Sequence, residues 1–259
     1  MPSIAAGDAT VHYEADGSGT GLVLVHGTQG SGATNWGHLV ERFAGDRTVI
    51  RPDYSGSGRT ADPGGPLTVE TLAGQVAAAA RDAVEGPVDV VGFSLGAVVA
   101  AAAAALHPGL VRRLVLVAGW PHTGDARQRL MFELWSDLAR ADFGLFNRMA
   151  MLTGFSPGFL EALGGRAIDA ALAVSAPEPG MDRQIDLDLR VDIRGLLPAI
   201  TAPTLVVGLA QDQIVPPSGP VALHEGIAGS RYVEIDSGHL VLHERPDELV
   251  ETVRAFVLD

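Results

Sequence analysis

Short apolar runs rich in valine, leucine and isoleucine alternate along this chain with longer stretches rich in alanine and leucine. Uninterrupted apolar runs suit strands buried on both faces, and their alternation with helical stretches predicts a mostly parallel sheet covered by helices. The runs are Leu22–Val25, Thr48–Arg51, Val88–Phe93, Arg113–Ala118, Thr204–Gly208 and Arg231–Ile235. Helices are predicted at Trp36–Ala44, Val69–Val84, Leu95–Leu106, Pro217–Gly226 and Pro246–Val257. We therefore expect an α/β fold with a mostly parallel central sheet of about eight strands and helices on both faces.

The residues before the first of these runs follow a different pattern. Ala9–Ala15 alternates in polarity and ends in Asp16-Gly17-Ser18-Gly19. Such alternation is typical of a strand with one face against the core and the other in water. An edge strand is therefore predicted here.

The segment from residue 121 to residue 197 interrupts the alternation, because it contains no comparable strand-like run. Amphipathic patterns at helical spacing cover Gln128–Ala141, Asp142–Leu152 and Pro157–Leu172, and the polar stretch Pro177–Asp192 follows. The acidic residues near the end of the segment are interpreted as a solvated face: Asp182, Asp186, Asp188 and Asp192. We predict that residues 121–197 form a helical lid inserted into a core domain made of residues 1–120 and 198–259.

Composition excludes several kinds of chemistry. Of 259 residues, 47% are apolar, so the chain can bury a sizeable core and is not expected to be disordered. The absence of cysteine excludes disulfides, zinc–thiolate sites and a cysteine nucleophile. All 18 basic residues are arginine, which excludes lysine chemistry. The net charge of −13 and the lack of a basic run argue against a nucleic-acid partner.

The sequence also lacks the patterns of a membrane span and of a secretory signal. Its first residues carry neither a basic region nor a long apolar one. The longest apolar run, Gly96–Leu106, is much shorter than the roughly 20 residues that a helix needs to cross a bilayer. We therefore expect a cytoplasmic protein with no membrane partner.

The sequence Gly92-Phe93-Ser94-Leu95-Gly96 lies between a predicted strand and a predicted helix. A serine at such a junction occupies a strained turn, flanked by small residues, and its hydroxyl is exposed at the end of the sheet. The helix N-terminus also stabilises negative charge that develops there. A turn that merely requires small residues is the alternative, but the flanking strand and helix favour a nucleophilic role for Ser94.

A serine hydroxyl is a weak nucleophile until a base takes its proton, and the base must be oriented by an acid. Asp212 and His239 each follow a predicted strand, so both are expected at the carboxyl end of the sheet, near Ser94. The sequence therefore contains candidates for all three members of a catalytic triad.

The chain resembles proteins of the α/β-hydrolase fold over essentially its whole length. The resemblance rests on the serine turn, on the chain order Ser94, Asp212, His239, and on two loops that follow strands, His26-Gly27-Thr28 and Asp53-Tyr54-Ser55-Gly56-Ser57-Gly58-Arg59-Thr60. Family members often carry histidine where Ser57 stands, and this departure falls in a structural turn. The resemblance implies a serine hydrolase whose oxyanion hole uses the backbone N–H groups of Thr28 and Leu95.

Other residues are alternatives for the acid and the base: Asp125, Asp236 and His243. The loops that contain Asp212 and His239 resemble the acid and base loops of the family, which favours these two residues over the alternatives. By contrast, His26 is interpreted as a structural residue that orders its loop by hydrogen bonding.

Aromatic residues near the predicted catalytic end are candidate walls of a substrate pocket, with core packing as the alternative: Trp120, Phe132 and Trp135. They suggest an uncharged, fairly apolar small-molecule substrate. No cluster of histidine and acidic residues has metal-ligand spacing, and a serine triad requires no cofactor, so neither a metal nor an organic cofactor is predicted.

The leading hypothesis is a serine hydrolase that cleaves an ester, lactone or thioester through an acyl-enzyme. The same triad layout also serves a biosynthetic thioesterase acting on a carrier protein, a cofactor-free haloperoxidase or perhydrolase, and a carbon–carbon hydrolase. A non-hydrolytic lyase or cyclase and a non-catalytic ligand receptor are further alternatives, because a fold does not determine a function.

Overall fold

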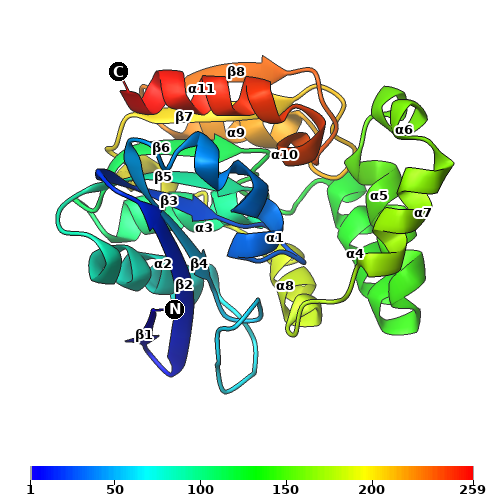
Figure 1. Cartoon of the computed structure of the whole chain (residues 1–259), viewed down its shortest axis with the longest axis horizontal. Helices are drawn as coiled ribbons and strands as arrows, with labels where there is room; N and C mark the ends of the chain where they lie inside the picture. Colours follow the sequence, from blue (N-terminus) through cyan, green and yellow to red (C-terminus); the bar gives the residue numbers. More distant parts are fainter. Residues whose placement is uncertain (1, 259) are drawn as a thin grey trace.

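An eight-stranded sheet forms the centre of the protein, in the order β1-β2-β4-β3-β5-β6-β7-β8 (Figure 1). The structure is a computed structural model and describes residues 2–258. The strands are β1 (Ser3–Ala6), β2 (Ala9–Gly17), β3 (Thr20–Val25), β4 (Arg47–Asp53), β5 (Val88–Phe93), β6 (Val111–Val117), β7 (Thr204–Leu209) and β8 (Arg231–Ile235). The pairs β1–β2 and β2–β4 are antiparallel, and all pairs from β4 to β8 are parallel.

All six apolar runs form strands, but the two edges of the sheet differ from the prediction. The alternating segment forms β2, which is not an edge strand, because β1 pairs with it through Ser3 and His12. At the other edge, β8 was expected to be buried on both faces, whereas only Ile235 among its residues is buried. A strand that pairs on one side only and ends the sheet is exposed more easily than the strands beside it.

Helices cover both faces of the sheet, and the strands supply alternate side chains to two cores. Leu22 and Leu24 belong to the core that includes Leu249 of α11 (Pro246–Leu258), and Val23 and Val25 to the other. This second core includes residues of α2 (Val69–Ala83), α3 (Leu95–Leu106) and α9 (Ser218–Gly226). Short helices complete the core region: α1 (Gly32–Trp36), η1 (Gly37–Arg42), η2 (Leu197–Ala199) and α10 (Val241–Glu244).

The helix predicted at Trp36–Ala44 begins earlier and has a different form. The chain enters α1 at Ser31, whose hydroxyl accepts a hydrogen bond from the Thr34 amide, while the Thr34 hydroxyl accepts one from the Ser31 amide. This reciprocal capping satisfies N–H groups that have no partner inside the helix, and it sets the start of α1. The residues after Trp36 form the 3-10 turn η1.

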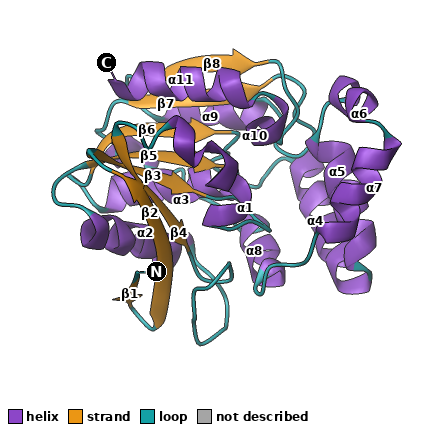
Figure 2. Cartoon of the chain, viewed as in Figure 1, coloured by secondary structure: helices purple, strands orange, loops and turns teal. Residues whose placement is uncertain are grey.

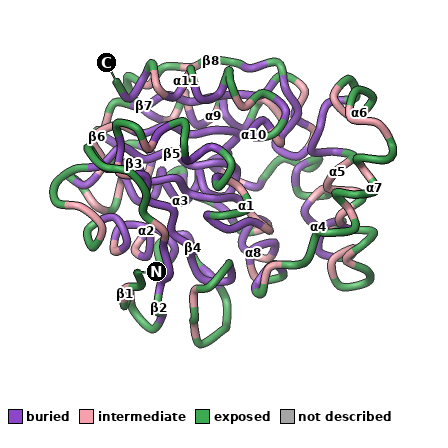
Figure 3. The backbone as a smooth tube through the Cα atoms, in the orientation of Figure 1, coloured by how far each residue is buried: buried purple, intermediate pink, exposed green. Residues whose placement is uncertain are grey.

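Between β6 and β7 the chain forms α4 (Ala126–Ala141), α5 (Phe143–Gly154), α6 (Pro157–Leu163), α7 (Gly165–Val174) and α8 (Met181–Asp188). Helices α4–α7 lie beyond the end of the sheet toward which the parallel strands point (Figure 2). The single helix predicted at Pro157–Leu172 is two helices, because Gly164 adopts a φ of +75° and ends α6. No residue of α6 or α7 is buried, in contrast to the strands beside α3 (Figure 3).

Helix α8 contradicts the interpretation of the polar stretch as a solvated face. Asp182 and Asp192 are exposed, as expected, but Asp188 is only 1% exposed. Gln184 and Ile185 on the same helix are also buried, because α8 packs beneath the loops that follow β3 and β4. Among residues 2–258, no helix is long and apolar enough to cross a membrane.

Two glycines allow the turn between β5 and α3 to form. A Cβ atom on Gly92 would overlap the carbonyl oxygen of Gly96, and one on Gly96 would overlap the carbonyl oxygens of Val25 and His26. Helix α3 can therefore cross directly over the ends of β5 and β3 only because these positions have no side chain. This crossing places Ser94 at the centre of the carboxyl edge of the sheet.

Replacing Gly92 with alanine should lower the free energy of unfolding by about 3 kcal/mol, at the upper end of the usual cost of overpacking. The matched control is Gly74→Ala in α2, where the new methyl group meets no atom within 4 Å. This control should be neutral or should stabilise the protein by about 0.5–1 kcal/mol, because glycine is costly inside a helix. Urea unfolding of both variants measures the difference, and equal stabilities would contradict the argument.

Candidate active site

Ser94 occupies a strained backbone conformation at the start of α3. Its φ of +56° and ψ of −125° lie in a region that residues with a side chain rarely adopt. The amide of Ser94 donates a hydrogen bond to the Val117 carbonyl of the neighbouring strand at 2.9 Å, which ties the turn to the sheet. The hydroxyl therefore stands at the end of β5 with the N-terminus of α3 behind it.

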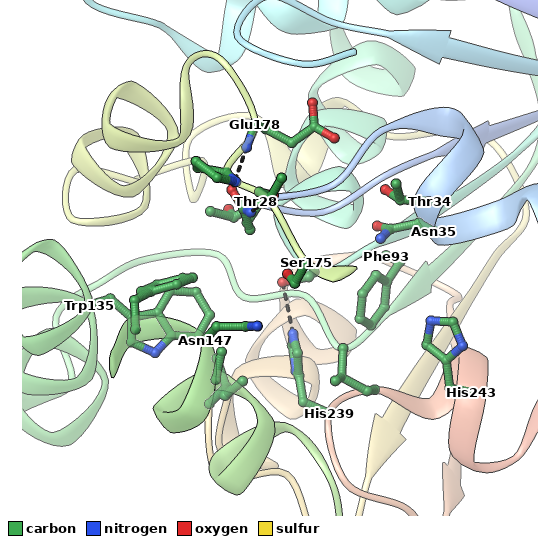
Figure 4. A pocket seen from close by; sticks show the side chains of 18 of the residues that line it. Thr28, Thr34, Asn35, Phe93, Trp135, Asn147, Ser175, Glu178, His239 and His243 are labelled. Carbon is green, nitrogen blue, oxygen red and sulfur yellow. Dashed lines mark hydrogen bonds between the residues drawn. The ribbon is translucent and has the colours of Figure 1, made fainter. Parts of the chain in front are cut away.

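His239 and Asp212 form a continuous chain of hydrogen bonds with Ser94. The Nε2 atom of His239 lies 3.0 Å from Ser94 Oγ, the contact drawn as a dashed line from His239 in Figure 4, and its Nδ1 atom lies 2.6 Å from Asp212 Oδ2. The other Asp212 oxygen accepts hydrogen bonds of 2.8 Å from the amides of Ile214 and Val215. The carboxylate is thus fixed on both oxygens, and it holds the imidazole with Nε2 directed at the serine.

The structure brings together the three residues expected to form a triad and leaves the alternatives outside it. Asp125 caps α4 by accepting a hydrogen bond from the Gln128 amide at 2.9 Å. Asp236 is exposed and accepts a hydrogen bond from the Gln211 side chain. His243 stacks on His38 with their ring centroids 4.5 Å apart, and it lines the cavity beside the triad.

The loop after β3 lies directly against the serine turn. A Cβ atom on Gly27 would be 3.0 Å from that of Ser94, and the Gly27 amide donates to Asn35 Oδ1 at 2.8 Å. Thr28 lines the cavity next to Ser94. The amide of Leu95 is the first of α3, so it has no acceptor within the helix. The loop that contains Thr28 and the first turn of α3, which begins at Leu95, therefore both lie next to Ser94.

His26 is buried beneath this loop. Its ring stacks on Tyr54 at a centroid distance of 3.9 Å, and its Nδ1 atom lies 2.9 Å from the Gly27 carbonyl oxygen. Burial lowers the pKa of His26 to about 4, which favours the neutral ring at neutral pH. The sequence predicts that His26 orders its loop, and the buried ring does contact two loop residues, Gly27 and Tyr54.

The loop that carries His239 is held by a buried carboxylate that sequence reasoning missed. Glu244 accepts hydrogen bonds from the amides of Gly238 and Ser156, at 3.2 and 2.9 Å, and from the Ser156 hydroxyl at 2.5 Å. The Leu240 amide also donates to the Gly154 carbonyl at 2.8 Å. These bonds join the His239 loop to the junction of α5 and α6. No local motif marks Glu244, because its partner Ser156 is distant in sequence.

A cavity of about 510 Å³ opens over Ser94 and His239. Trp135 and Asn147 lie on one side of it and Thr34, Asn35 and His243 on the other (Figure 4). Further wall residues from the segment between β6 and β7 were not predicted: Phe146, Ala150 and residues 174–178. The amphipathic pattern of Asp142–Leu152 was the available signal for Phe146.

Of the aromatic residues expected to form the wall, Trp135 lines the cavity and the other two do not. Trp120 and Phe132 are each 1% exposed, and their rings contact each other in a tilted arrangement with centroids 5.3 Å apart. The Trp120 indole N–H donates to the Thr123 hydroxyl at 2.8 Å, which directs it into the core. Phe132 contacts Trp135 from behind, at 5.7 Å between centroids, so the two rings support the wall without forming it.

The described residues contain no group of three or more histidine and acidic side chains that could hold a metal ion. The site thus holds a serine hydroxyl beside an imidazole that a buried carboxylate orients.

Comparison with known proteins agrees with this arrangement. Residues 21–246 match the model of the alpha/beta hydrolase fold family. A pyrrolizixenacetamide deacetylase of Xenorhabdus hominickii is 46% identical, with 100% of this chain and 98% of that protein covered. A pimeloyl-[acyl-carrier protein] methyl ester esterase of Xanthomonas oryzae pv. oryzae is 30% identical over 95% of this chain and 98% of its own.

Among solved structures, the enol-lactonase from Burkholderia xenovorans LB400 superposes with a TM-score of 0.86 over the full length of both chains, at 24% sequence identity. At this identity the similarity concerns the fold. Together with the family match and the relatives above, it shows that the chain belongs to the α/β hydrolase fold family and is a hydrolase.

The strain at Ser94 predicts a stability difference between two variants of this residue. Ser94→Gly removes the Cβ atom that makes this φ unfavourable, whereas Ser94→Ala keeps it. The glycine variant should therefore be more stable than the alanine variant by about 1 kcal/mol, after the greater flexibility of glycine in the unfolded chain is subtracted. Urea unfolding compares the two variants directly. An alanine variant as stable as the glycine variant would show that the turn is not strained.

Proposed function

We propose that this protein is a serine hydrolase that cleaves an ester, lactone or thioester bond of a small, fairly apolar substrate through an acyl-enzyme. The observation that carries the proposal is the hydrogen-bonded chain Ser94–His239–Asp212, buried at the base of a cavity large enough for a small molecule. Burial excludes bulk water from the polar groups, which strengthens the interactions among them.

In the first half of the reaction, Ser94 Oγ attacks the carbonyl carbon while its proton passes to His239 Nε2. Asp212 keeps the imidazole in the tautomer that accepts this proton and stabilises the imidazolium that results. The backbone N–H groups of Thr28 and Leu95 donate to the oxyanion of the tetrahedral intermediate. A donor of this kind typically lowers the barrier by about 3–4 kcal/mol.

The intermediate collapses when the carbon–heteroatom bond breaks and His239 returns the proton to the leaving group. The acyl group then remains on Ser94 Oγ as an ester. A water molecule gives its proton to His239 Nε2 and attacks the acyl carbon, and the second tetrahedral intermediate releases the acid and regenerates the hydroxyl of Ser94.

We further propose that residues 121–197 act as a lid over this site. Support comes from the cavity wall, which takes Trp135 from α4, Phe146 and Ala150 from α5, and residues 174–178 from the end of α7 and the following loop. The apolar members of this wall suit an uncharged, fairly apolar small molecule. Closure by such a segment would exclude water and orient the substrate.

A second candidate is the hydrolysis of an acetamide. The relative that is 46% identical over the whole chain is named as a deacetylase of an acetamide. The proposed mechanism accommodates an amide, because the imidazolium of His239 can protonate the leaving nitrogen as the carbon–nitrogen bond breaks. Both candidates share the acyl-enzyme and differ in the leaving group.

The role of Ser94 is tested with p-nitrophenyl esters of increasing chain length. Ser94→Ala should lower kcat by about 10⁴-fold or more, because it removes the nucleophile. Asp212→Asn should lower kcat by about 10³–10⁴-fold, because it favours the wrong imidazole tautomer. Mass spectrometry of rapidly quenched wild-type protein should show the acyl group on the peptide that contains Ser94.

The control for this assay is the fold of each variant. The circular dichroism spectrum of each variant should match that of the wild type, so that a loss of turnover reports on chemistry. Undiminished turnover by the folded Ser94→Ala variant would overturn the acyl-enzyme mechanism.

The two candidates are separated by paired acetyl substrates with the same chromogenic group. If the protein is a deacetylase of amides, it should hydrolyse p-nitroacetanilide as well as p-nitrophenyl acetate, and Ser94→Ala should hydrolyse neither. The physical requirement is protonation of the leaving nitrogen by His239. Turnover of the acetate ester alone, at every pH between 6 and 9, would exclude the amide candidate and retain the ester candidate.

A further inference from the structure

The loop after β3 is held in place by helix α8, which comes from a distant part of the sequence. Asp188 Oδ2 accepts a hydrogen bond from the Thr28 hydroxyl at 2.8 Å, and Gln184 Oε1 accepts one from the Gln29 amide at 2.9 Å. The two α8 residues are 1% and 0% exposed. Their bonds therefore hold consecutive residues of the loop from one side, away from bulk water.

Gln29 shows why the loop needs such support. Its φ is +59°, a left-handed conformation that is unfavourable for a residue with a side chain. Its side chain donates to the Ala176 carbonyl at 2.9 Å and accepts from the Glu178 amide at 3.0 Å. With the bond to Gln184, these contacts over-determine a conformation that the loop would leave if it were free.

Gln184 also contacts Ser57 in the loop after β4. Its Nε2 atom donates to Ser57 Oγ at 2.6 Å, while its Oε1 atom accepts from the Gln29 amide. The Ser57 hydroxyl thus orients the amide group of Gln184. The loops after β3 and β4 are linked through this one side chain.

Asp188 is a costly residue to bury if its role is only to support the fold. Its Oδ1 atom is buried and has no hydrogen-bond partner in the described part of the chain. Burial raises the pKa of Asp188 well above its usual range, which favours the neutral carboxyl. An apolar residue of similar size would avoid the unpartnered oxygen. The carboxyl of Asp188 supplies a hydrogen-bond acceptor for the Thr28 hydroxyl, which an apolar residue would not.

We propose that Asp188 is a positioning residue for the oxyanion hole: through the Thr28 hydroxyl, it holds the Thr28 backbone N–H in the direction of Ser94. Gln184 supports the same loop at the next residue. This inference rests on the proposed function, because it concerns the transition state of that reaction. It also makes α8, which belongs to the segment between β6 and β7, part of the apparatus that stabilises the oxyanion.

The proposal predicts a specific kinetic pattern for substitutions of Asp188. Asp188→Ala should lower kcat for p-nitrophenyl acetate by about 10–100-fold with little change in KM, since a misplaced oxyanion donor affects the transition state more than the bound substrate. Asp188→Asn should retain most of kcat, because its amide oxygen can accept from Thr28. The matched control, Asp182→Asn, alters an exposed aspartate of the same helix and should not change kcat.

A transition-state analogue distinguishes positioning from a general structural role. A methyl trifluoromethyl ketone adds to Ser94 Oγ, the serine proton passes to His239, and the former carbonyl oxygen becomes an oxyanion in the hole. Its inhibition constant should rise in Asp188→Ala by the factor by which kcat falls. The inhibition constant of acetate, which lacks the tetrahedral centre, should stay within twofold of the wild-type value.

A double-mutant cycle tests the connection to Thr28. Thr28→Val removes the hydroxyl and keeps the backbone amide, so it should reproduce the kinetic defect of Asp188→Ala. The double variant should be no more than about threefold slower than either single variant, because both changes break one hydrogen bond. Thr28→Val leaves Asp188 in place, so it supplies the test if Asp188→Ala does not fold.

The outcomes separate this inference from the function on which it rests. Three results would each overturn the positioning role. The first is a wild-type kcat in folded Asp188→Ala or Thr28→Val, and the second is multiplicative effects on kcat in the double variant. The third is a defect in kcat of Asp188→Asn as large as that of Asp188→Ala. In all of these cases, loss of turnover in Ser94→Ala still supports the proposed hydrolase. Turnover by Ser94→Ala would instead overturn the proposed function itself.

Discussion

The direct contact between the serine turn and the end of β3 is the constraint on which the rest of the site depends. Gly96 lies against the carbonyl oxygens of Val25 and His26, with no space for a Cβ atom. The parallel pairing of Val25 with Gly92 brings the ends of the two strands to the same level. Ser94 and the loop after β3 are therefore neighbours because two backbones touch, whatever side chains line the cavity above them.

His239 and Asp212 are placed by buried hydrogen bonds rather than by backbone contact. Asp212 receives three hydrogen bonds, two from amides of its own loop and one from His239. Glu244 holds the loop before His239 through the Gly238 amide. Each of these carboxylates is buried, and an unpaired buried carboxylate is costly, so the same bonds that stabilise the loops also restrict their geometry.

The helices between β6 and β7 contact both the loop after β3 and the loop that carries His239. At one end, Asp188 and Gln184 of α8 hold the loop after β3; at the other, Ser156 at the start of α6 shares Glu244 with the His239 loop. The same segment supplies Trp135 to the cavity wall. The cavity wall and the loops that carry Thr28 and His239 are therefore linked through one segment.

Much of the core could be predicted because its signals are local. An apolar run predicts a buried strand, and a turn of small residues at its end places Ser94, so the strands and the three residues of the triad followed from short stretches of sequence. The prediction is wrong at the edges of the sheet, where the pairing and exposure of a strand depend on the strands beside it. β1 has only four residues and no apolar run, and β8 is exposed because nothing pairs with its outer side.

The sequence by itself determined the alternation of buried strands with the helices of the core, the serine turn, and the positions of Asp212 and His239 past the ends of two strands. Only the tertiary structure decided that Trp135 faces the cavity while Phe132 packs behind it, and that Asp188 is buried. In a polar stretch, Asp188 resembles any surface aspartate until its partner is known. That partner, Thr28, lies 160 positions away, and a contact at such a distance depends on how the helices pack rather than on any local pattern.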